Sequence, residues 1–122
     1  QQVVIESPFI TTKRMNKLVP VFNKLVRRGV KIYVITRDPR EHLSPYKEQS
    51  EREICHFERI GVQTLICKGN HHRKLAIIDQ EILWEGSLNI LSQIKSREIM
   101  RRFKGGGFAV DMFNFLKLER FI

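Results

Sequence analysis

The 122-residue chain contains only two cysteines, Cys55 and Cys67, and it has no apolar run long enough to cross a bilayer. Two cysteines are too few for a disulfide framework, so we expect an intracellular, cytoplasmic protein. No cleavable signal sequence is visible at the start of the chain. The first residue is Gln1 rather than Met, which indicates a fragment of a longer protein.

Acidic residues are also scarce, because 13 Asp and Glu face 22 Lys and Arg, for a formal net charge of +9. An excess of this size favours a polyanionic partner, either nucleic acid or an anionic membrane surface. The alternative is a basic face that is merely solvated. The basic residues that could form a nucleic-acid track are Arg27, Arg28, Arg37, Arg40, Arg73, Arg97, Arg101, Arg102 and Lys104.

No internal repeat or low-complexity tract is present, so secondary structure can be traced from the spacing of apolar residues. The spacing predicts strands over 3–5, 30–36, 62–66 and 98–103, a hairpin of 72–78 with 81–85, and helices over 12–28, 46–60 and 108–121. Pro20 requires that the first helix either begins near Asn16 or is kinked. The order of elements predicts one α/β domain over 1–122, with a layered mixed β-sheet flanked by helices.

Two short motifs lie on either side of the predicted hairpin turn at Asp79-Gln80. They are H-x-K-x4-D over His72, Lys74 and Asp79, and G-S-x-N over Gly86, Ser87 and Asn89. Residues two apart on a strand share a face, so we expect His72 and Lys74 to point one way and Arg73 the other. The hairpin would return Gly86 and Ser87 to the start of the His72 strand.

The side chains gathered in this way suit a tetrahedral phosphate. The Lys74 ammonium and the Asn89 amide can bond phosphate oxygens where charge must be stabilised in the transition state. The His72 imidazole can attack phosphorus or transfer a proton. The spacing therefore predicts phosphoryl chemistry at one end of the hairpin.

Together the two motifs resemble the HKD signature of the phospholipase D superfamily. The single copy and the short chain resemble the small bacterial HKD endonucleases, and similar domains occur in helicase-associated and restriction-associated proteins. The resemblance implies a phospholipase D-like fold, an active site that two HKD motifs form together, and a covalent phosphohistidine. It also implies that no metal or other cofactor is needed.

The resemblance assigns a role to each motif residue. His72 is the nucleophile or the general acid, Lys74, Ser87 and Asn89 hold the phosphate, and Asp79 ties the hairpin turn together. Glu98 lies where the family places a carboxylate behind the imidazole, which would fix its tautomer. Arg73, within the first motif, and Arg97, next to Glu98, are basic residues that we expect to add substrate contacts. We expect His71 to lie in a loop or at the surface.

Two alternatives concern single residues. Glu98 could form an ordinary ion pair with Arg97 or Arg101. A zinc site can also be imagined, although the spacing of its donors matches no usual zinc pattern. Those donors would be Cys55, His56, Cys67, His71 and His72.

Three functions compete for the whole chain. The first is a metal-independent nuclease that cleaves DNA, or alternatively RNA, as a homodimer with two His72 residues facing each other across its axis. The second is a phospholipid hydrolase or transphosphatidylase, which uses the same chemistry but for which no anchoring helix is apparent. The third is a non-catalytic nucleic-acid-binding module of a larger helicase or restriction protein.

Overall fold

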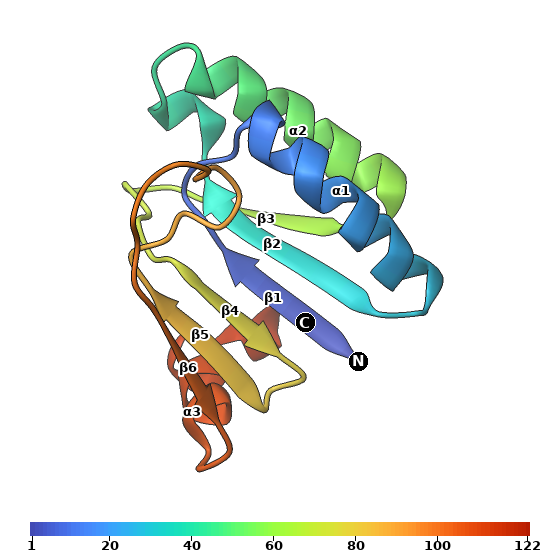
Figure 1. Ribbon diagram of the computed structural model, residues 1–122, viewed down its shortest axis with the longest axis vertical. Coiled ribbons are helices and arrows are strands. Elements are labelled where there is room, and N and C mark those ends of the chain that lie inside the picture. The colour runs from blue at the N-terminus through green and yellow to red at the C-terminus, as the bar shows by residue number, and fades with distance from the viewer.

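A computed structural model describes residues 1–122 and contains one six-stranded mixed sheet, in the order β3-β2-β1-β4-β5-β6 (Figure 1). β1 (Gln2–Glu6), β2 (Lys31–Arg37) and β3 (Gln63–Cys67) are parallel, whereas β4 (Leu75–Ile78), β5 (Ile82–Gly86) and β6 (Met100–Lys104) join by antiparallel pairing. Helical crossovers connect the parallel strands and short connections suffice for the others, as the fold prediction requires.

The sheet lies between two helical layers. α1 (Thr12–Arg27) and α2 (Tyr46–Ile60) cover one face, and α3 (Phe108–Phe115) with the 3₁₀ turn η2 (Leu118–Arg120) covers the other (Figure 1). A further 3₁₀ turn, η1 (Pro39–Glu41), follows β2. None of the helices is both long and apolar enough to cross a membrane.

Alternating side chains along the strands pack into two separate hydrophobic cores, one on each face of the sheet. On β1, Ile5 packs into the cluster beneath α1 and α2, and Val4 packs into the cluster beneath α3. On β4, Ala76 joins the first cluster while Leu75 and Ile77 join the second. Because successive strand side chains point to opposite faces, an apolar run that is buried on both sides is what a three-layer fold needs.

The helices differ from the prediction at two places. α1 begins at Thr12, with Thr11 as its N-cap, and runs through Pro20, so a start near Asn16 is wrong. The predicted helix 108–121 ends at Phe115, because Lys117 adopts a left-handed backbone conformation and the chain turns to bury Leu118.

The strands near the motifs are also shorter than predicted. β4 begins at Leu75 rather than His72, and β6 begins at Met100 rather than Glu98. The reason is the neighbouring strand: β1 pairs with β4 only as far as Glu6 opposite Leu75, and no ladder continues beyond that point. His72 and Lys74 therefore lie on a connection that leads into the sheet.

One end of the sheet collects most of the polar residues of interest. The last residues of β1, β2 and β5 and the first residues of β4 and β6 meet there, because Glu6 pairs with Leu75 and Gly86 pairs with Met100. Asp79 lies at the opposite end of β4, beside the beginning of β1.

Candidate active site

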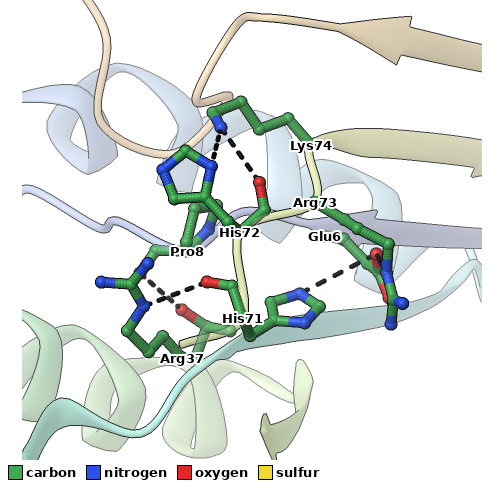
Figure 2. Close-up of polar contacts among 8 residues, drawn as sticks. Glu6, Pro8, Arg37, His71, His72, Arg73 and Lys74 are labelled. Carbon is green, nitrogen blue, oxygen red and sulfur yellow. Dashed lines mark hydrogen bonds and ion pairs between the residues drawn. The ribbon is translucent and has the colours of Figure 1, made fainter. Parts of the chain in front are cut away.

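His72 and Lys74 project from the same side of the segment that enters β4 (Figure 2). The Lys74 Nζ lies 2.8 Å from His72 Nδ1 and donates to the main-chain oxygen of His72 at 3.0 Å. The predicted common orientation of the two side chains is thus confirmed, although the residues precede the strand. Their proximity places an imidazole and an ammonium at one point of the surface.

His71 and Arg73 project to the other side, toward the buried carboxylate of Glu6 on β1 (Figure 2). Arg73 Nε donates to Glu6 Oε2 at 3.0 Å, and His71 Nε2 lies 3.8 Å from the same oxygen. The expectation that His71 lies at the surface is wrong, because its ring is buried. Arg73, expected to contact the substrate, uses its guanidinium to neutralise Glu6.

Burial shifts the pKa values of this internal group in opposite directions. Desolvation raises the pKa of Glu6, against the lowering effect of the Arg73 hydrogen bond and charge. Desolvation, with the nearby Arg73 and Arg37 cations, lowers the pKa of His71 to about 4. His71 is therefore neutral at neutral pH. The Arg73–Glu6 ion pair anchors the segment on which His72 and Lys74 stand.

Arg37, at the end of β2, is a third cation near His72 that the motifs do not contain. Its Nε donates to the main-chain oxygen of His71 at 3.0 Å (Figure 2). The sequence predicts it only as part of a basic track, although its position at the end of a buried strand is where ligand-binding residues of parallel sheets gather.

Neighbouring positive charges lower the pKa values of both His72 and Lys74. The pKa of His72 is lowered, first by the charge of Lys74, then by desolvation and by Arg37. Desolvation lowers the pKa of Lys74, and Arg37 lowers it further, while Glu98 raises it. An imidazole next to two cations favours its neutral, nucleophilic form.

Gly86 and Ser87 lie beside this group, as predicted, because the Gly86 amide donates to the Lys74 carbonyl at 3.4 Å. At Gly86 a Cβ atom would lie 2.0 Å from the carbonyl oxygen of Ile99, so only glycine allows β5 and β6 to approach this closely. The Ser87 amide and hydroxyl both bond the main chain of Ile99, at 3.0 and 3.1 Å.

Glu98 accepts a hydrogen bond from the Ser87 hydroxyl. We predicted that the Glu98 carboxylate lies behind the imidazole. In the structure the Nδ1 of His72 faces Lys74 and not a carboxylate. Glu98 also forms no ion pair with Arg97 or Arg101. Its charge instead acts on Lys74 and holds Ser87 in place.

The remaining predicted residues are Asn89, Asp79 and Arg97. Asn89 donates to Gln93 at 3.4 Å, and its buried carbonyl oxygen has no hydrogen-bond partner. Asp79 accepts from the Gln2 amide at 2.8 Å and has a left-handed backbone, which fits the expected role in the turn. Arg97 is exposed and takes part in no hydrogen bond or ion pair. None of these three side chains forms a hydrogen bond with His72 or Lys74.

An open cavity of about 600 Å³ adjoins the group. Its walls come from the motif segment, the β5–β6 edge and α3. The lining residues are His72, Arg73, Lys74, Leu75, Glu85, Gly86, Ser87, Ile99, Arg101, Met112 and Phe115. Such a cavity, with an ammonium and a hydroxyl at one end, can receive a phosphate oxygen next to the imidazole.

The donors of the alternative zinc site are not gathered, since no three His, Cys, Asp or Glu side chains lie close enough together to hold a metal ion. Cys55 is exposed on α2, whereas Cys67 ends β3, and both are free thiols.

Comparison with known proteins gives a consistent family. Residues 1–101 match the family model described as "Cardiolipin synthase, PLD-like domain". No curated protein matches the sequence. Among solved structures, Nuc from Salmonella typhimurium, a phospholipase D family member, has 16% identity and a TM-score of 0.70, with 94% of this chain and 74% of that chain covered.

Two further solved structures share the fold. NucT from Helicobacter pylori has 18% identity and a TM-score of 0.64, covering 93% of this chain and 75% of that one. A phosphatidylserine synthase from Haemophilus influenzae has 12% identity and a TM-score of 0.61, covering 94% of this chain and 31% of that one. The matched family model spans both sequence motifs and the strands that position them, and on this ground the chain belongs to the PLD-like family.

Proposed function

We propose that this chain is a metal-independent phosphodiesterase, one half of a homodimeric nuclease that cleaves DNA through a phosphohistidine on His72. The observation that carries the proposal is the Lys74 ammonium 2.8 Å from the His72 imidazole at the edge of an open cavity. The net charge of +9 favours a nucleic acid as the phosphodiester. Nuc, a phospholipase D family member, shares the fold of this chain, and so does NucT.

The reaction depends on the tautomer of His72. While Lys74 donates to Nδ1, the neutral ring carries its proton on Nε2, which leaves no lone pair on Nε2 for attack. A substrate phosphate competes for the ammonium, and Nδ1 can then hold the proton and donate to the ring's own main-chain oxygen, whose hydrogen bond raises the pKa of His72. In that tautomer the lone pair of Nε2 is free to attack.

In the proposed first step the Nε2–P bond forms and a P–O bond of the DNA breaks. The leaving alkoxide takes a proton from the Nε2 of a second histidine, an imidazolium on the far side of phosphorus, and that ring becomes a neutral imidazole. Water then attacks phosphorus, the P–N bond breaks, and the second imidazole accepts the water proton. Lys74 and Ser87 hold the equatorial oxygens, and Asn89 joins them if the 87–99 connection shifts on binding.

One imidazole cannot stand on both sides of an in-line displacement, and this chain offers no second histidine facing the cavity. The partner's His72 would supply it in a two-fold dimer. A dimer also doubles the cationic surface that faces the substrate.

A cleavage assay in chelator tests the proposal. Wild type should cut DNA, His72→Ala should lose activity by at least about 1,000-fold, and His56→Ala, on α2 away from the cavity, should keep it. Absence of cleavage of every single- and double-stranded DNA and RNA would contradict the nuclease. Tight DNA binding without turnover in a verified dimer would favour a binding module.

A phospholipid substrate is the second candidate, because exposed apolar side chains border the same cavity. Ile99 and Phe115 are 73% and 77% exposed, and they could contact acyl chains. The family model carries the description of cardiolipin synthase. Turnover of phosphatidylglycerol vesicles in the same assay, with no cleavage of nucleic acid, would establish this function instead.

A further inference from the structure

An aromatic cluster lies beside His72 and belongs to neither motif. The Phe9 ring, in the connection between β1 and α1, meets the His72 ring edge-on with centroids 6.4 Å apart. Phe9 also meets Tyr46, the first residue of α2, at 5.3 Å, and the Arg37 guanidinium lies 5.2 Å from its ring centroid. The cluster thus links the imidazole to an aromatic ring that is 43% exposed on Tyr46.

The base of the cluster is fixed. The ring of His42 is buried, lies 4.9 Å from Phe9, and its Nε2 lies 3.0 Å from the carbonyl oxygen of Pro8. Desolvation lowers the pKa of His42, so a neutral ring supports Phe9 from beneath. At the end of the cluster away from His72, the exposed Tyr46 ring is open to a ligand.

A groove of about 440 Å³ continues from Tyr46. Lys13 and Lys95 line it, and neither lysine takes part in a hydrogen bond or an ion pair. No carboxylate lies along its walls, whose other members are Thr11, Pro45, Gln49, Ser92 and Ile94. The groove therefore combines two unpaired cations with one exposed aromatic face.

We propose that this groove binds a single-stranded segment of the nucleic acid. A base stacks on Tyr46, a phosphate lies between Lys13 and Lys95, and the adjoining nucleotide passes over Phe9 and Arg37 to reach His72. The inference rests on the proposed function, because it takes the scissile phosphate to lie at His72. It adds the strandedness of the substrate and the path by which the strand leaves the catalytic cavity.

Chemistry selects a single strand over the other polyanions. A base offers its flat face to an aromatic side chain only when it is unstacked from its neighbours, which a duplex prevents. A phospholipid headgroup would satisfy the lysines but has no planar ring for Tyr46. Only a single strand supplies both a phosphate and a ring at each repeat.

Binding measured by fluorescence anisotropy tests the stacking contact, with a short labelled oligonucleotide of mixed sequence and its duplex as probes. Tyr46→Ala should weaken single-strand binding about tenfold, whereas Tyr46→Phe, which keeps the ring, should stay close to wild type. Duplex binding should change much less. Equal losses on single strand and duplex, or unchanged single-strand binding in Tyr46→Ala, would overturn the proposal.

The salt dependence of binding tests the phosphate contact. The double variant Lys13→Ala/Lys95→Ala should reduce the slope of log K against log salt by about 0.7, since the one phosphate between the two lysines contributes about 0.7 on a single strand. The matched control is Lys24→Ala/Lys31→Ala, which removes two exposed lysines outside the groove. An equal reduction in both double variants would indicate diffuse attraction and overturn the site.

A small reporter separates this inference from the proposed function. Bis(p-nitrophenyl) phosphate is a phosphodiester without a strand, so its His72-dependent hydrolysis tests the chemistry alone. If it is hydrolysed, Tyr46→Ala should lower the ratio of kcat/KM for the oligonucleotide to kcat/KM for the reporter about tenfold. An unchanged ratio overturns the groove while the chemistry stands. A wild type inert to every phosphodiester overturns the chemistry, and the anisotropy data then decide the groove. If Tyr46→Ala loses binding to phosphatidylglycerol vesicles but keeps its binding to the oligonucleotide, the single-strand assignment is overturned.

Discussion

The imidazole of His72 lies among charges of one sign. Lys74 is the largest cause of its lowered pKa, and Arg37 adds a smaller effect in the same direction. Both cations disfavour the imidazolium, so the ring stays neutral to lower pH than a solvated histidine. The same ammonium can bind a phosphate oxygen, which couples substrate binding to release of the ring nitrogen.

Replacing Lys74 by methionine separates these effects. Lys74→Met should raise the pKa of His72, because the main cation that opposes the imidazolium is removed. The acidic limb of the kcat/KM profile should move to higher pH, and kcat should fall by about 100-fold to 1,000-fold with the loss of a phosphate ligand. NMR titration of the His72 ring measures the shift directly. A lower or unchanged pKa would contradict the assigned contact.

His71 makes the folded state sensitive to acid. Its pKa is about 4 in the folded chain against 6.5 for a solvated histidine, so the unfolded chain binds the proton more readily. Folding stability from this residue is therefore complete above about pH 6.5 and is lost as the pH falls toward 4. The loss amounts to about 3 kcal/mol at most. The raised pKa of Glu6 acts in the opposite direction.

Urea unfolding of wild type and His71→Gln at neutral and acidic pH measures this contribution. Glu6 is present in both proteins, so the difference between them reports the histidine together with its coupling to Glu6. The stability advantage of wild type over His71→Gln should shrink on acidification. An advantage that stays constant between pH 7 and pH 4.5 would show that the His71 ring is not buried in its neutral form.

The sequence patterns predicted the orientation of some of the site residues but not all of their neighbours. Alternation correctly placed His72 and Lys74 on one side and Arg73 on the other, because the side chains already alternate in the residues that lead into β4. Arg37 and Glu6 were not predicted as neighbours of the motif, since they come from β1 and β2 and the strand order is not encoded in any local spacing. The partner of Glu98 was missed because its connection to Ser87 is irregular.

At the scale of elements, the contact between β5 and β6 holds Ser87 next to Lys74. Gly86 pairs with Met100, and the approach of the two strands leaves no room for a side chain at Gly86. The glycine of the G-S-x-N motif is therefore required by strand packing before any chemistry is considered. A larger residue would have to move the β6 edge or the 87–99 connection.

Gly86→Ala tests this packing. The added methyl group clashes with the main-chain oxygen of Ile99, which cannot rotate away, so we expect a loss of about 1–3 kcal/mol in unfolding free energy. Activity should fall further than stability explains, because Ser87 moves with the strand. Thermal melting and kcat on the same samples measure both effects. Wild-type stability and activity in Gly86→Ala would contradict the close approach.

Elements with strong periodicity were predicted well. The apolar spacing of α1 and α2 and the glycine after each helix located both helices to within one or two residues. The predicted strand at 72–78 was too long because a strand ends where its neighbour ends, and β1 stops pairing at Glu6. The last helix was overextended because nothing in its composition announces the left-handed turn at Lys117.

At the scale of the molecule, the fold gathers strand ends from the whole chain at one end of the sheet (Figure 1). That arrangement supplies one imidazole, and the proposed displacement requires two. The mixed α/β sheet was predicted from the order of elements, whereas the surface through which two copies would meet cannot be inferred from periodicity.

Mixing of subunits tests the composite site. Wild type and His72→Ala are mixed in varying proportions, allowed to exchange subunits, and assayed at constant total protein. If each site needs two His72 residues, mixed dimers are inactive and activity falls as the square of the wild-type fraction. An activity that follows the wild-type fraction linearly, or a fully active monomer, would contradict the dimeric site.

Trapping of the covalent intermediate tests the central claim most directly. Wild type is mixed with ³²P-labelled DNA in chelator and quenched in alkali, where a phosphohistidine survives, and the labelled peptide is sequenced by mass spectrometry. We predict label on His72 in wild type and in His56→Ala, and none in His72→Ala. DNA cleavage without labelled protein, or label on any residue other than His72, would contradict the account.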